Sequence, residues 1–493
     1  MAMKTKTPRR AELESAITVA TEKADRVGRP QFVSCQAAVE GGDPLALFEG
    51  ASSGAHRFYW SQPAGELALA SWGAEATIET KGPGRFAEAW RAVADIGAAT
   101  HLGPGTADWA GPLFVGGFAF SDQPQVGGVW HAFPTARLVL PRVLFKMQGD
   151  SCALWVTQRV APGGSPGELT DRWESSLLEG VEQVARVWHR VPEVSMASEA
   201  SFHEGEPGEE YAVVADRAHD VYRGQVAAAL RAIAAGDFEK VVLARALDVR
   251  HPGRFDVEAF LDSLQGIYPH CTTLAVSHGD DTVVAASPEL LLRRQGGRIE
   301  TCALAGSARR GRSPEEDDAL AQALHDSDKE RAEHGAVVRS IRAALEPVCS
   351  KLTGPPEPEL MRVEGIQHLA TPLAGELGGG ANGPSVLELA SRLHPTAAVG
   401  GLPVAEAGRW LAQEEGLARG WYAGPIGWLD AAGNGEWWLA LRSALIRNST
   451  ESDGVSEARL FAGAGVVAGS DPELELRETR LKLRALLAPL TEI

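Results

Sequence analysis

The segment Lys240-Val241-Val242-Leu243-Ala244-Arg245 is an apolar run framed by two cations. A short run of apolar and β-branched residues is typical of a buried strand. Before it, Val226, Leu230 and Ile233 recur at helical spacing, and Gly236 stands where a helix C-cap is expected. We therefore predict a helix that ends near Gly236 and a strand that begins at Lys240.

The same alternation of helices and strands continues through the C-terminal part of the chain. The patterns predict further strands at Thr282–Ala286, Arg298–Leu304, Trp437–Leu441 and Arg459–Phe461, and helices at Ser327–Leu345 and Pro472–Leu487. Strands and helices mixed in this way predict a layered α/β (α+β) body over residues 210–493.

The first part of the chain is predicted to be β-rich. Strand-like segments such as Leu138–Leu140 and Cys152–Val156 lie among glycines and prolines, and we assign residues 29–200 to this half. Residues 1–28 are basic at the start and charged throughout, and we expect this segment to be flexible. A polar stretch over about residues 191–210 is typical of an exposed connector between the halves.

Composition excludes several classes of protein. The 493 residues, 44% hydrophobic and 23% charged, suit a globular chain with a large core. Its net charge of −18 disfavours nucleic acid, so an anionic ligand would need a local site of cations, metal or backbone N–H groups. No segment resembles a secretion signal, and no apolar run reaches the roughly 18 residues of a membrane span. Five scattered cysteines without Cys-x-x-Cys spacing predict buried thiols in a cytoplasmic protein.

Two pairs of glutamates share the same helical spacing. Glu330 and Glu333 stand three residues apart, as do Glu475 and Glu478, so each pair lies on one helix face. If the two faces meet, they offer the carboxylate oxygens that Mg²⁺ prefers. Acidic helix positions are more often solvated, and Lys482 at i+4 from Glu478 suits an ordinary surface ion pair. The spacing leaves both interpretations open.

Lys240 and Glu289 are candidates for proton transfer. A lysine at a strand end commonly extends its amine to solvent, but a desolvated amine near other cations can act as a general base. Glu289 is followed directly by three leucines, and a partly apolar site would raise its pKa and make it a proton donor. The alternative for Glu289 is a turn carboxylate that caps the next element.

Other polar positions carry weaker signals. We interpret Gly463-Ala464-Gly465 as a tight turn whose N–H groups can hold a carboxylate. Arg442 suits bidentate binding of a carboxylate, although structural ion pairs are commoner. His368 and Tyr422 are hydrogen-bonding groups that occur as often in ordinary cores.

In their order along the chain, these segments resemble the chorismate-utilising enzyme family. The resemblance covers about residues 210–488 and implies the fold of anthranilate synthase component I, with large mixed β-sheets flanked by helices. The matching segments are Lys240–Arg245, Ser287-Pro288-Glu289, Ala305-Gly306-Ser307, Glu333-His334, His368-Leu369-Ala370-Thr371-Pro372, Leu393-His394-Pro395-Thr396, Gly435-Glu436-Trp437, Ala462-Gly463-Ala464-Gly465 and Arg477-Glu478-Thr479.

The resemblance also implies a chemistry. Mg²⁺ holds the ring carboxylate of chorismate, a nucleophile adds at C2, and the C4 hydroxyl leaves with a proton from Glu289. Glu333 and Glu478 match the principal Mg²⁺ ligands, and Glu330 and Glu475 match second carboxylates that bind directly or through water. The residues that match the substrate's surroundings are Gly306, His368, Tyr422, Arg442, Gly463, Gly465 and Lys482.

Branch identity within the family depends on Lys240. In the branches of the family that use ammonia, the corresponding motif has an amide side chain at this position. Lysine at this position is typical of the branches that add water. No cysteine lies in a Gly-x-Cys-x-Gly elbow, so no fused glutaminase supplies ammonia, although this leaves a separate subunit open. With water as the nucleophile we expect no glutaminase subunit, and we expect a monomer. Salicylate synthases carry threonine at the position of Ala398, so Ala398 favours a reaction that stops at isochorismate and feeds menaquinone or siderophore synthesis. The alternatives are a salicylate synthase, which also eliminates pyruvate, and a catalytically silent chorismate-binding homologue.

Overall fold

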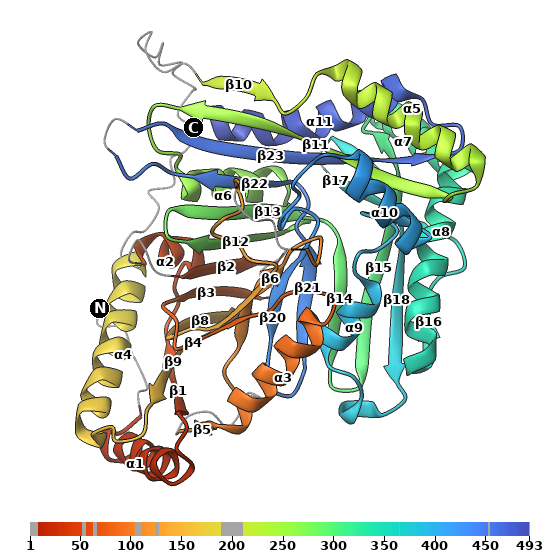
Figure 1. The fold of residues 1–493 in the computed structure, drawn as a ribbon. Coiled ribbons are helices and arrows are strands. Elements are labelled where there is room, and N and C mark those ends of the chain that lie inside the picture. Colours follow the sequence, from red (N-terminus) through yellow and green to blue (C-terminus); the bar gives the residue numbers. More distant parts are fainter. Residues whose placement is uncertain are drawn as a thin grey trace.

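Two large β-sheets, each flanked by helices, form the layers of the fold (Figure 1). They are seen in a computed structural model that describes residues 8–51, 56–62, 67–103, 111–123, 128–188, 211–363, 365–451 and 454–492. The connector predicted over residues 191–210 lies outside these ranges.

The first sheet has thirteen strands in the described ranges and draws them from both halves of the sequence. Its midpoint is the antiparallel pair β12–β2, where Leu274 lies opposite Trp60. In spatial order the strands are β10 (Ala212–Ala215), β11 (Lys240–His251), β23 (Ser456–Val467), β22 (Ser443–Arg447), β13 (Asp281–Ser287), β12 (Thr272–His278), β2 (Arg57–Ser61), β3 (Ala68–Trp72), β8 (Val143–Gln148), β9 (Ser151–Val160), β1 (Gln31–Val39) and β5 (Thr100–Leu102), with β19 (Gly401–Leu402) beside β11.

The second sheet has ten strands among the described residues and is also mixed in origin. Strand β6 from the first half pairs with β20 from the second, with Gly116 opposite Gly427. The order is β16 (Cys349–Thr353), β18 (Ile366–Leu377), β15 (Arg298–Arg309), β14 (Leu290–Gln295), β21 (Gly435–Leu439), β20 (Pro425–Leu429), β6 (Phe114–Phe118), β7 (Ala136–Leu140) and β4 (Ala76–Glu79), with β17 (Glu359–Val363) beside β18.

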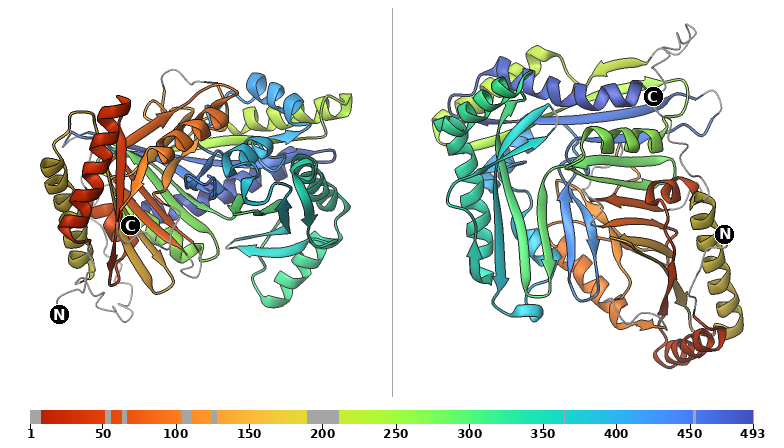
Figure 2. Two further views of the ribbon diagram at one scale, coloured as in Figure 1. Left: turned by 90° about the horizontal axis from the view of Figure 1, so that it is seen from below. Right: turned by 180° about the vertical axis from the view of Figure 1, so that it is seen from behind.

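Helices cover the outer faces of both sheets, as the views in Figure 2 show. Helices α5 and α11 run along β11 and β23, and α8 runs along β15 (Figure 1). Within the described ranges, no helix is both long and apolar enough to cross a lipid bilayer. The helices are α1 (Arg10–Val27), α2 (Pro44–Gly50), α3 (Arg85–Ala98), α4 (Pro166–Trp188), α5 (His219–Ala235), α6 (Val257–Ile267), α7 (Pro314–Asp326), α8 (Asp328–Leu345), α9 (Val386–Leu393), α10 (Val404–Glu414) and α11 (Pro472–Thr491), with 3₁₀ turns η2 (Glu346–Val348) and η3 (Gly380–Asn382).

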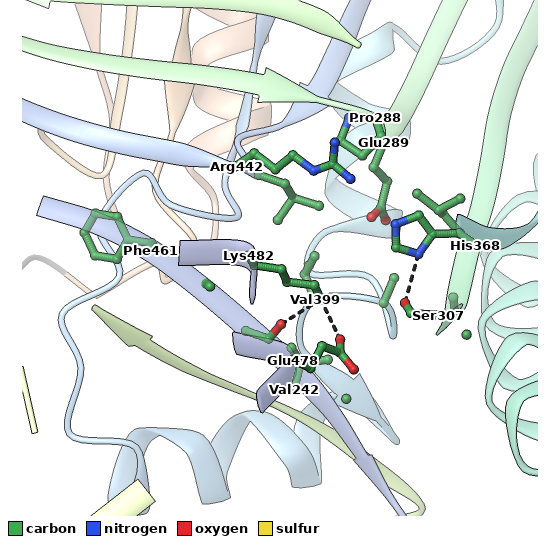
Figure 3. Close-up of a pocket in the computed structure, with 18 of the residues that line it drawn as sticks. Val242, Pro288, Glu289, Ser307, His368, Val399, Arg442, Phe461, Glu478 and Lys482 are labelled. Atoms are coloured by element: carbon green, nitrogen blue, oxygen red, sulfur yellow. Dashed lines mark hydrogen bonds and ion pairs between the residues drawn. The ribbon is translucent and has the colours of Figure 1, made fainter. Parts of the chain in front are cut away.

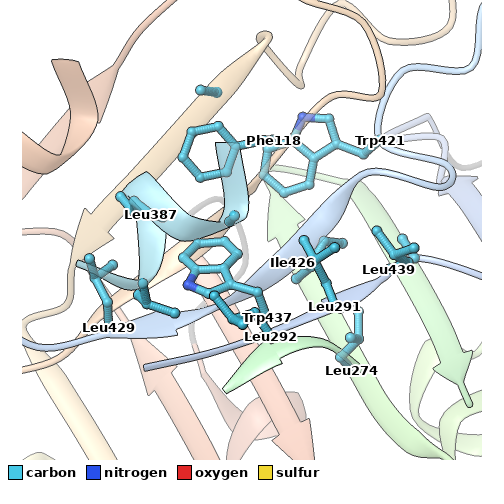
Figure 4. Packing of buried hydrophobic residues seen from close by; sticks show 14 of the residues in the cluster. Phe118, Leu274, Leu291, Leu292, Leu387, Trp421, Ile426, Leu429, Trp437 and Leu439 are labelled. Atoms are coloured by element: carbon cyan, nitrogen blue, oxygen red, sulfur yellow. The ribbon is translucent and has the colours of Figure 1, made fainter. Parts of the chain in front are cut away.

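The main hydrophobic core joins strands of both sheets with helices α3 and α9 (Figure 4). The ring of Phe118 stacks on Phe86 with centroids 4.1 Å apart and meets the edge of Trp437 at 5.4 Å. Leu292 from β14 and Leu387 from α9 are completely buried in the same cluster. Because close-packed aromatic and branched side chains resist displacement, the core fixes the two sheets relative to each other.

Local structure in the C-terminal half follows the predicted pattern. Helix α5 ends at Gly236, whose φ of 83° gives the left-handed C-cap, and β11 begins at Lys240. Ser327 caps α8 by accepting from the Glu330 N–H group, and Asp471 caps α11. The predicted helices and strands are therefore confirmed in position, although the strand predicted over Trp437–Leu441 ends at Leu439. The N-terminal strands Leu138–Leu140 and Cys152–Val156 lie within β7 and β9.

The structure differs from the sequence interpretation at two places. Residues 10–27, within the segment expected to be flexible, form helix α1, because Leu13, Ile17 and Ala24 repeat on one face and are buried. The predicted turn at Gly463-Ala464-Gly465 is wrong, since these residues lie inside β23 and face Ala244, Leu243 and Val242 of β11. Glycine at positions 463 and 465 leaves space beside the strand and does not change the direction of the chain.

Candidate active site

A pocket lies where β11 and β23 of the first sheet approach β15 and β18 of the second, and helices α8 and α11 contribute to its lining (Figure 3). Its lining combines carboxylates, cations, small residues and a few apolar side chains. The lining residues are Val242, Pro288, Glu289, Leu304, Ala305, Gly306, Ser307, Glu333, His368, Ala398, Val399, Tyr422, Leu441, Arg442, Phe461, Ala462, Gly463, Gly465, Glu478 and Lys482. Most of the residues predicted from sequence are thus brought together.

Lys240 lies behind this lining and does not reach solvent. Its side chain is 2% exposed, and its Nζ lies 2.8 Å from Oε1 of Glu333. The alternative of a lysine extended to water at a strand end is therefore wrong. A buried ammonium requires a partner, and Glu333 on α8 supplies it across the edge of the pocket.

Glu289 lies between β13 and β14, and its carboxyl group points into the pocket (Figure 3). Burial raises its pKa to about 8, against the opposing effects of Lys240 and Lys482. The backbone holds it in place, because its N–H group donates to Ser287 Oγ and its carbonyl accepts from the Leu439 N–H group. At neutral pH, Glu289 is a protonated carboxylic acid inside a polar pocket, which is the state that a proton donor needs.

A bulge in β15 shapes the wall opposite. The pairing with β18 shifts between Ala305 and Ser307, and Gly306 between them has a φ of 78°. The Ser307 N–H group donates to Oε2 of Glu330, and Ser307 Oγ lies 2.9 Å from Nδ1 of His368. Burial, with the nearby Arg442 and Lys482, lowers the pKa of His368 to about 3, so this ring is neutral. It presents hydrogen-bonding nitrogens without a charge.

The two glutamate pairs lie on helices that face one another. The pKa of Glu475 is raised to about 7 by burial and then by Glu478, and the pKa of Glu330 is raised by burial and then by Glu333. Lys329 lies between the outer members, 3.5 Å from Glu330 Oε1 and 3.6 Å from Glu475 Oε1. The four carboxylates therefore form one cluster of concentrated negative charge rather than two solvated surfaces.

This donor set fits a magnesium ion held by few protein ligands. Among the described residues, no three His, Cys, Asp or Glu side chains converge on one point. Of the four glutamates on α8 and α11, Glu333 and Glu478 line the pocket, and each carboxylate is paired with a lysine. Mg²⁺ commonly binds through one or two carboxylates and keeps waters and substrate oxygens, so one glutamate from each helix suffices.

Cations and strand glycines line the side of the pocket next to β23. Lys482 Nζ lies 2.7 Å from Glu478 Oε1 and donates to the Gly463 carbonyl at 3.0 Å. A Cβ atom at Gly465 would lie 2.6 Å from Glu333 Oε1, and one at Gly463 would lie 3.0 Å from Tyr422 Oη. These glycines are therefore required by the close approach of Glu333 and Tyr422.

The Gly465 N–H group points away from β11. Its cross-strand neighbour Val242 donates its own N–H group to Gly400 rather than to β23. In an antiparallel pair, opposite residues turn their N–H groups in the same sense, either both toward or both away from the partner strand. The N–H groups that we expected in a turn at Gly463–Gly465 are therefore presented by strand β23.

Several lining residues carry no signal in the sequence. Phe461 stacks on Tyr422 with centroids 5.1 Å apart, and Trp130 from the first half stacks on the other side of Phe461 at 5.6 Å. Apolar residues such as Val242, Val399 and Leu441 resemble any core position. Ser307 is the exception, because it belongs to the Ala305-Gly306-Ser307 motif and could be recognised next to Gly306. Glu330, Glu475 and Lys240 are predicted residues outside the lining itself.

Comparison with known proteins extends the likeness over nearly the whole chain. The family described as "Chorismate binding enzyme" matches residues 18–491. Isochorismate synthase MenF of Bacillus subtilis (strain 168) is 32% identical over 479 residues, which cover 96% of each chain. The salicylate biosynthesis isochorismate synthase of Pseudomonas aeruginosa is 35% identical over 476 residues, covering 96% of this chain and 92% of that protein.

The fold has a solved counterpart as well. The menaquinone-specific isochorismate synthase MenF of Escherichia coli superposes with a TM-score of 0.73 at 24% identity, covering 97% of this chain and 100% of that one. The family match and the two relatives include the N-terminal half, where the sequence motifs gave little resemblance. By its sequence, its fold and the pocket between its sheets, this chain belongs to the chorismate binding enzyme family.

Proposed function

We propose that this protein is an isochorismate synthase that converts chorismate to isochorismate by adding water at C2 with loss of the C4 hydroxyl group. One observation carries the proposal: the buried acid Glu289 lines the pocket, and the buried Lys240 behind the lining is close enough to oppose the rise in the Glu289 pKa. The two relatives compared above are both named isochorismate synthases, which supports the same reaction.

Glu289 donates the proton to the departing hydroxyl group. Hydroxide is a poor leaving group, so the reaction needs an acid that holds its proton near neutral pH. Burial gives Glu289 that property through a pKa of about 8. After the hydroxyl leaves as water, the Glu289 carboxylate faces Lys240 and Lys482, whose charges stabilise it.

Lys240 accepts a proton from the attacking water. Its Nζ lies 2.8 Å from Oε1 of Glu333. Lys240 is buried behind the residues that line the pocket. General base catalysis requires the amine to act in its deprotonated form. An amide at this position has no lone pair basic enough for the task, which is why lysine favours water rather than ammonia as nucleophile.

Magnesium belongs in this proposal at Glu333 and Glu478, where it would neutralise the carboxylate of the substrate's ring. Glu330 and Glu475 support those ligands from behind, held together by Lys329. These residues suit Mg²⁺ because both helices bring carboxylate oxygens, the donors that Mg²⁺ prefers, to one side of the pocket.

Arg442, Lys482 and the amides at Gly463 and Gly465 receive the enolpyruvyl carboxylate. All four lie in the lining, on the side next to β23 and the β21–β22 turn. Two cations and oriented N–H groups give a local positive field in a protein whose net charge is −18. His368 and Tyr422 add further hydrogen-bonding groups to the lining, and Ala398 contributes a small side chain to it.

The deciding experiment is incubation of the full chain with chorismate, with and without Mg²⁺, followed by proton NMR and a pyruvate assay. Isochorismate without pyruvate supports the proposal, and salicylate with equal pyruvate would reassign the protein to salicylate synthesis. Binding without turnover would identify a silent homologue. An aminated product formed only with ammonia would remove Lys240 from its role.

Substitution of Lys240 tests the base directly. Lys240→Ala is expected to lower turnover by about 10²–10⁴-fold while chorismate binding persists. Lys351→Ala, at an exposed position on β16, is the matched control and should behave as wild type.

A further inference from the structure

Arg442 occupies a strained backbone position in the turn between β21 and β22. Its φ is 46°, in the left-handed region that residues other than glycine rarely adopt. Its carbonyl accepts from the Ala286 N–H group at 3.1 Å, which ties the turn to the residues just before Glu289. The side chain then extends across the pocket toward Glu289 and His368 (Figure 3). Such strain persists only where the surroundings hold the conformation.

The support for the guanidinium group comes from the end of helix α6. The ring of Tyr268, the C-cap residue, lies beneath it with 4.5 Å between Cζ of Arg442 and the ring centroid. Nη1 of Arg442 also donates to Sγ of Cys271 at 3.8 Å. Tyr268 and Cys271 are 2% and 3% exposed, so this support is buried. Within the described ranges, no carboxylate forms an ion pair with Arg442.

An aromatic support suits an arginine that must bind a carboxylate. The ring attracts the face of the guanidinium plane, whereas the N–H donors lie within that plane. A glutamate or aspartate partner would occupy the donors and cancel the charge. A ring holds the group in position and leaves most of its donors available to the pocket.

Tyr268 also contacts the helix that carries two other pocket residues. Its Oη donates to the carbonyl of Ala485 on α11, with 3.4 Å between the oxygens. The same helix carries Glu478 and Lys482, which line the pocket. One buried tyrosine therefore relates the arginine of the β21–β22 turn to the acid and lysine of α11.

We propose that Tyr268 is the positioning residue that holds Arg442 in its substrate-binding orientation. The inference rests on the proposed function, in which Arg442 binds a carboxylate of chorismate. Tyr268 itself does not line the pocket, so it acts on the substrate through Arg442, and the Tyr268→Phe variant separates this effect from the hydrogen bond to α11. It should therefore act on substrate affinity and leave the proton transfers of Glu289 and Lys240 unchanged.

The test is a double-mutant cycle on the full-length enzyme with KM and kcat for chorismate as readouts. Tyr268→Leu should raise KM by about tenfold, the size of a desolvated cation–π contact, with kcat within about twofold of wild type. Tyr268→Phe keeps the ring and should restore KM to within about twofold. Arg442→Ala should raise KM by about 10- to 100-fold, and adding Tyr268→Leu to it should change KM no further.

Other outcomes overturn the inference. An unchanged KM in Tyr268→Leu, or an equal increase with and without Arg442, would show that Tyr268 has a purely structural role. If the leucine variant does not fold, Tyr268→Met replaces the ring with a flexible apolar chain and carries the same expectations.

A wild-type enzyme that folds but does not convert chorismate would contradict the proposed function and not this inference. In that case crystal structures of wild type and Tyr268→Leu decide the matter. A guanidinium group displaced from the pocket in the variant supports the inference, and an unmoved one contradicts it.

Discussion

Lys240 on β11 and Glu333 on α8 form a buried ion pair, with 2.8 Å between Nζ and Oε1. The contact joins the sheet to the helix that carries a proposed magnesium ligand. Because a buried charge without its partner is costly, the two residues are expected to respond to substitution together.

The first prediction concerns Glu333→Gln. Loss of one of two carboxylate ligands should raise the Mg²⁺ concentration for half-maximal activity by about tenfold or more. Mg²⁺ binding measured by calorimetry should weaken in parallel. Glu346→Gln, at an exposed position beyond the end of α8, is the control and should match wild type in both measurements. Equal Mg²⁺ titrations for all three proteins would remove Glu333 from the metal site.

A second prediction follows from the raised pKa of Glu289. The acid is protonated below about pH 8 and loses its proton above it, so kcat should fall as the pH rises through that value. Glu289→Gln cannot donate a proton, and its kcat should be lower by about 10²–10⁴-fold at pH 7. Measurement of kcat from pH 6 to pH 9.5 provides the check. A rate that is level from pH 7 to pH 9.5 would contradict the assignment of Glu289.

Gly465→Ala provides a third, steric prediction. The added methyl group would lie 2.6 Å from Oε1 of Glu333 and 3.4 Å from Cε of Lys240, so at least one of these side chains must move. We expect turnover to fall by about tenfold or more, since catalytic groups tolerate little displacement. Gly224→Ala in α5 meets no atom within 4 Å and should leave turnover unchanged while stabilising the helix by about 0.4–1 kcal/mol.

A fourth prediction concerns the stability of the fold in acid. Burial lowers the pKa of His278, His368 and His394 to about 3, and lowers that of His56 well below its usual value. The folded state therefore excludes protons that the unfolded chain binds below about pH 6.5. Stability should be complete above that pH and decline as the pH falls toward 3, at up to about 1.4 kcal/mol per pH unit for each ring.

Urea denaturation at pH 7.5 and pH 5.5 measures this decline. The variant His278→Gln should show a smaller difference between the two pH values than wild type, because one ring no longer titrates. Identical differences in the two proteins would mean that His278 does not contribute.

Much of the local structure could be predicted from the sequence, because the signals are local. Gly236 ends α5 and Lys240 opens β11 as expected, since a left-handed cap and an apolar run depend on neighbouring residues. The pairing of β12 with β2 could not be predicted, because residues such as Leu274 and Trp60 meet only through the tertiary fold. The family resemblance over about residues 210–488, carried by short motifs of polar and small residues, is confirmed, and the family match extends it to residues 18–491.

Within the site, the sequence identified charged residues and missed their supports. Glu289 and Lys240 stand out because charge is unusual in an apolar run, whereas Phe461 and Tyr268 resemble any buried aromatic residue. The turn assigned to Gly463–Gly465 failed because glycine commonly marks turns. In this structure glycine is needed at these positions because Glu333 and Tyr422, from distant parts of the chain, approach the strand closely.

The position of β23 has a consequence for protein synthesis. This strand, residues 456–467, lies between β11 and β22 and is the hydrogen-bonded link from β10 and β11 to the remainder of the first sheet. A nascent chain therefore cannot join those strands to the others until residues 456–467 have left the ribosome. A product that terminates before residue 456 would expose unpaired edges on both β11 and β22, and such edges invite aggregation. Folding of the pocket thus waits for the synthesis of β23, and chains truncated before it are expected to be insoluble rather than partly active.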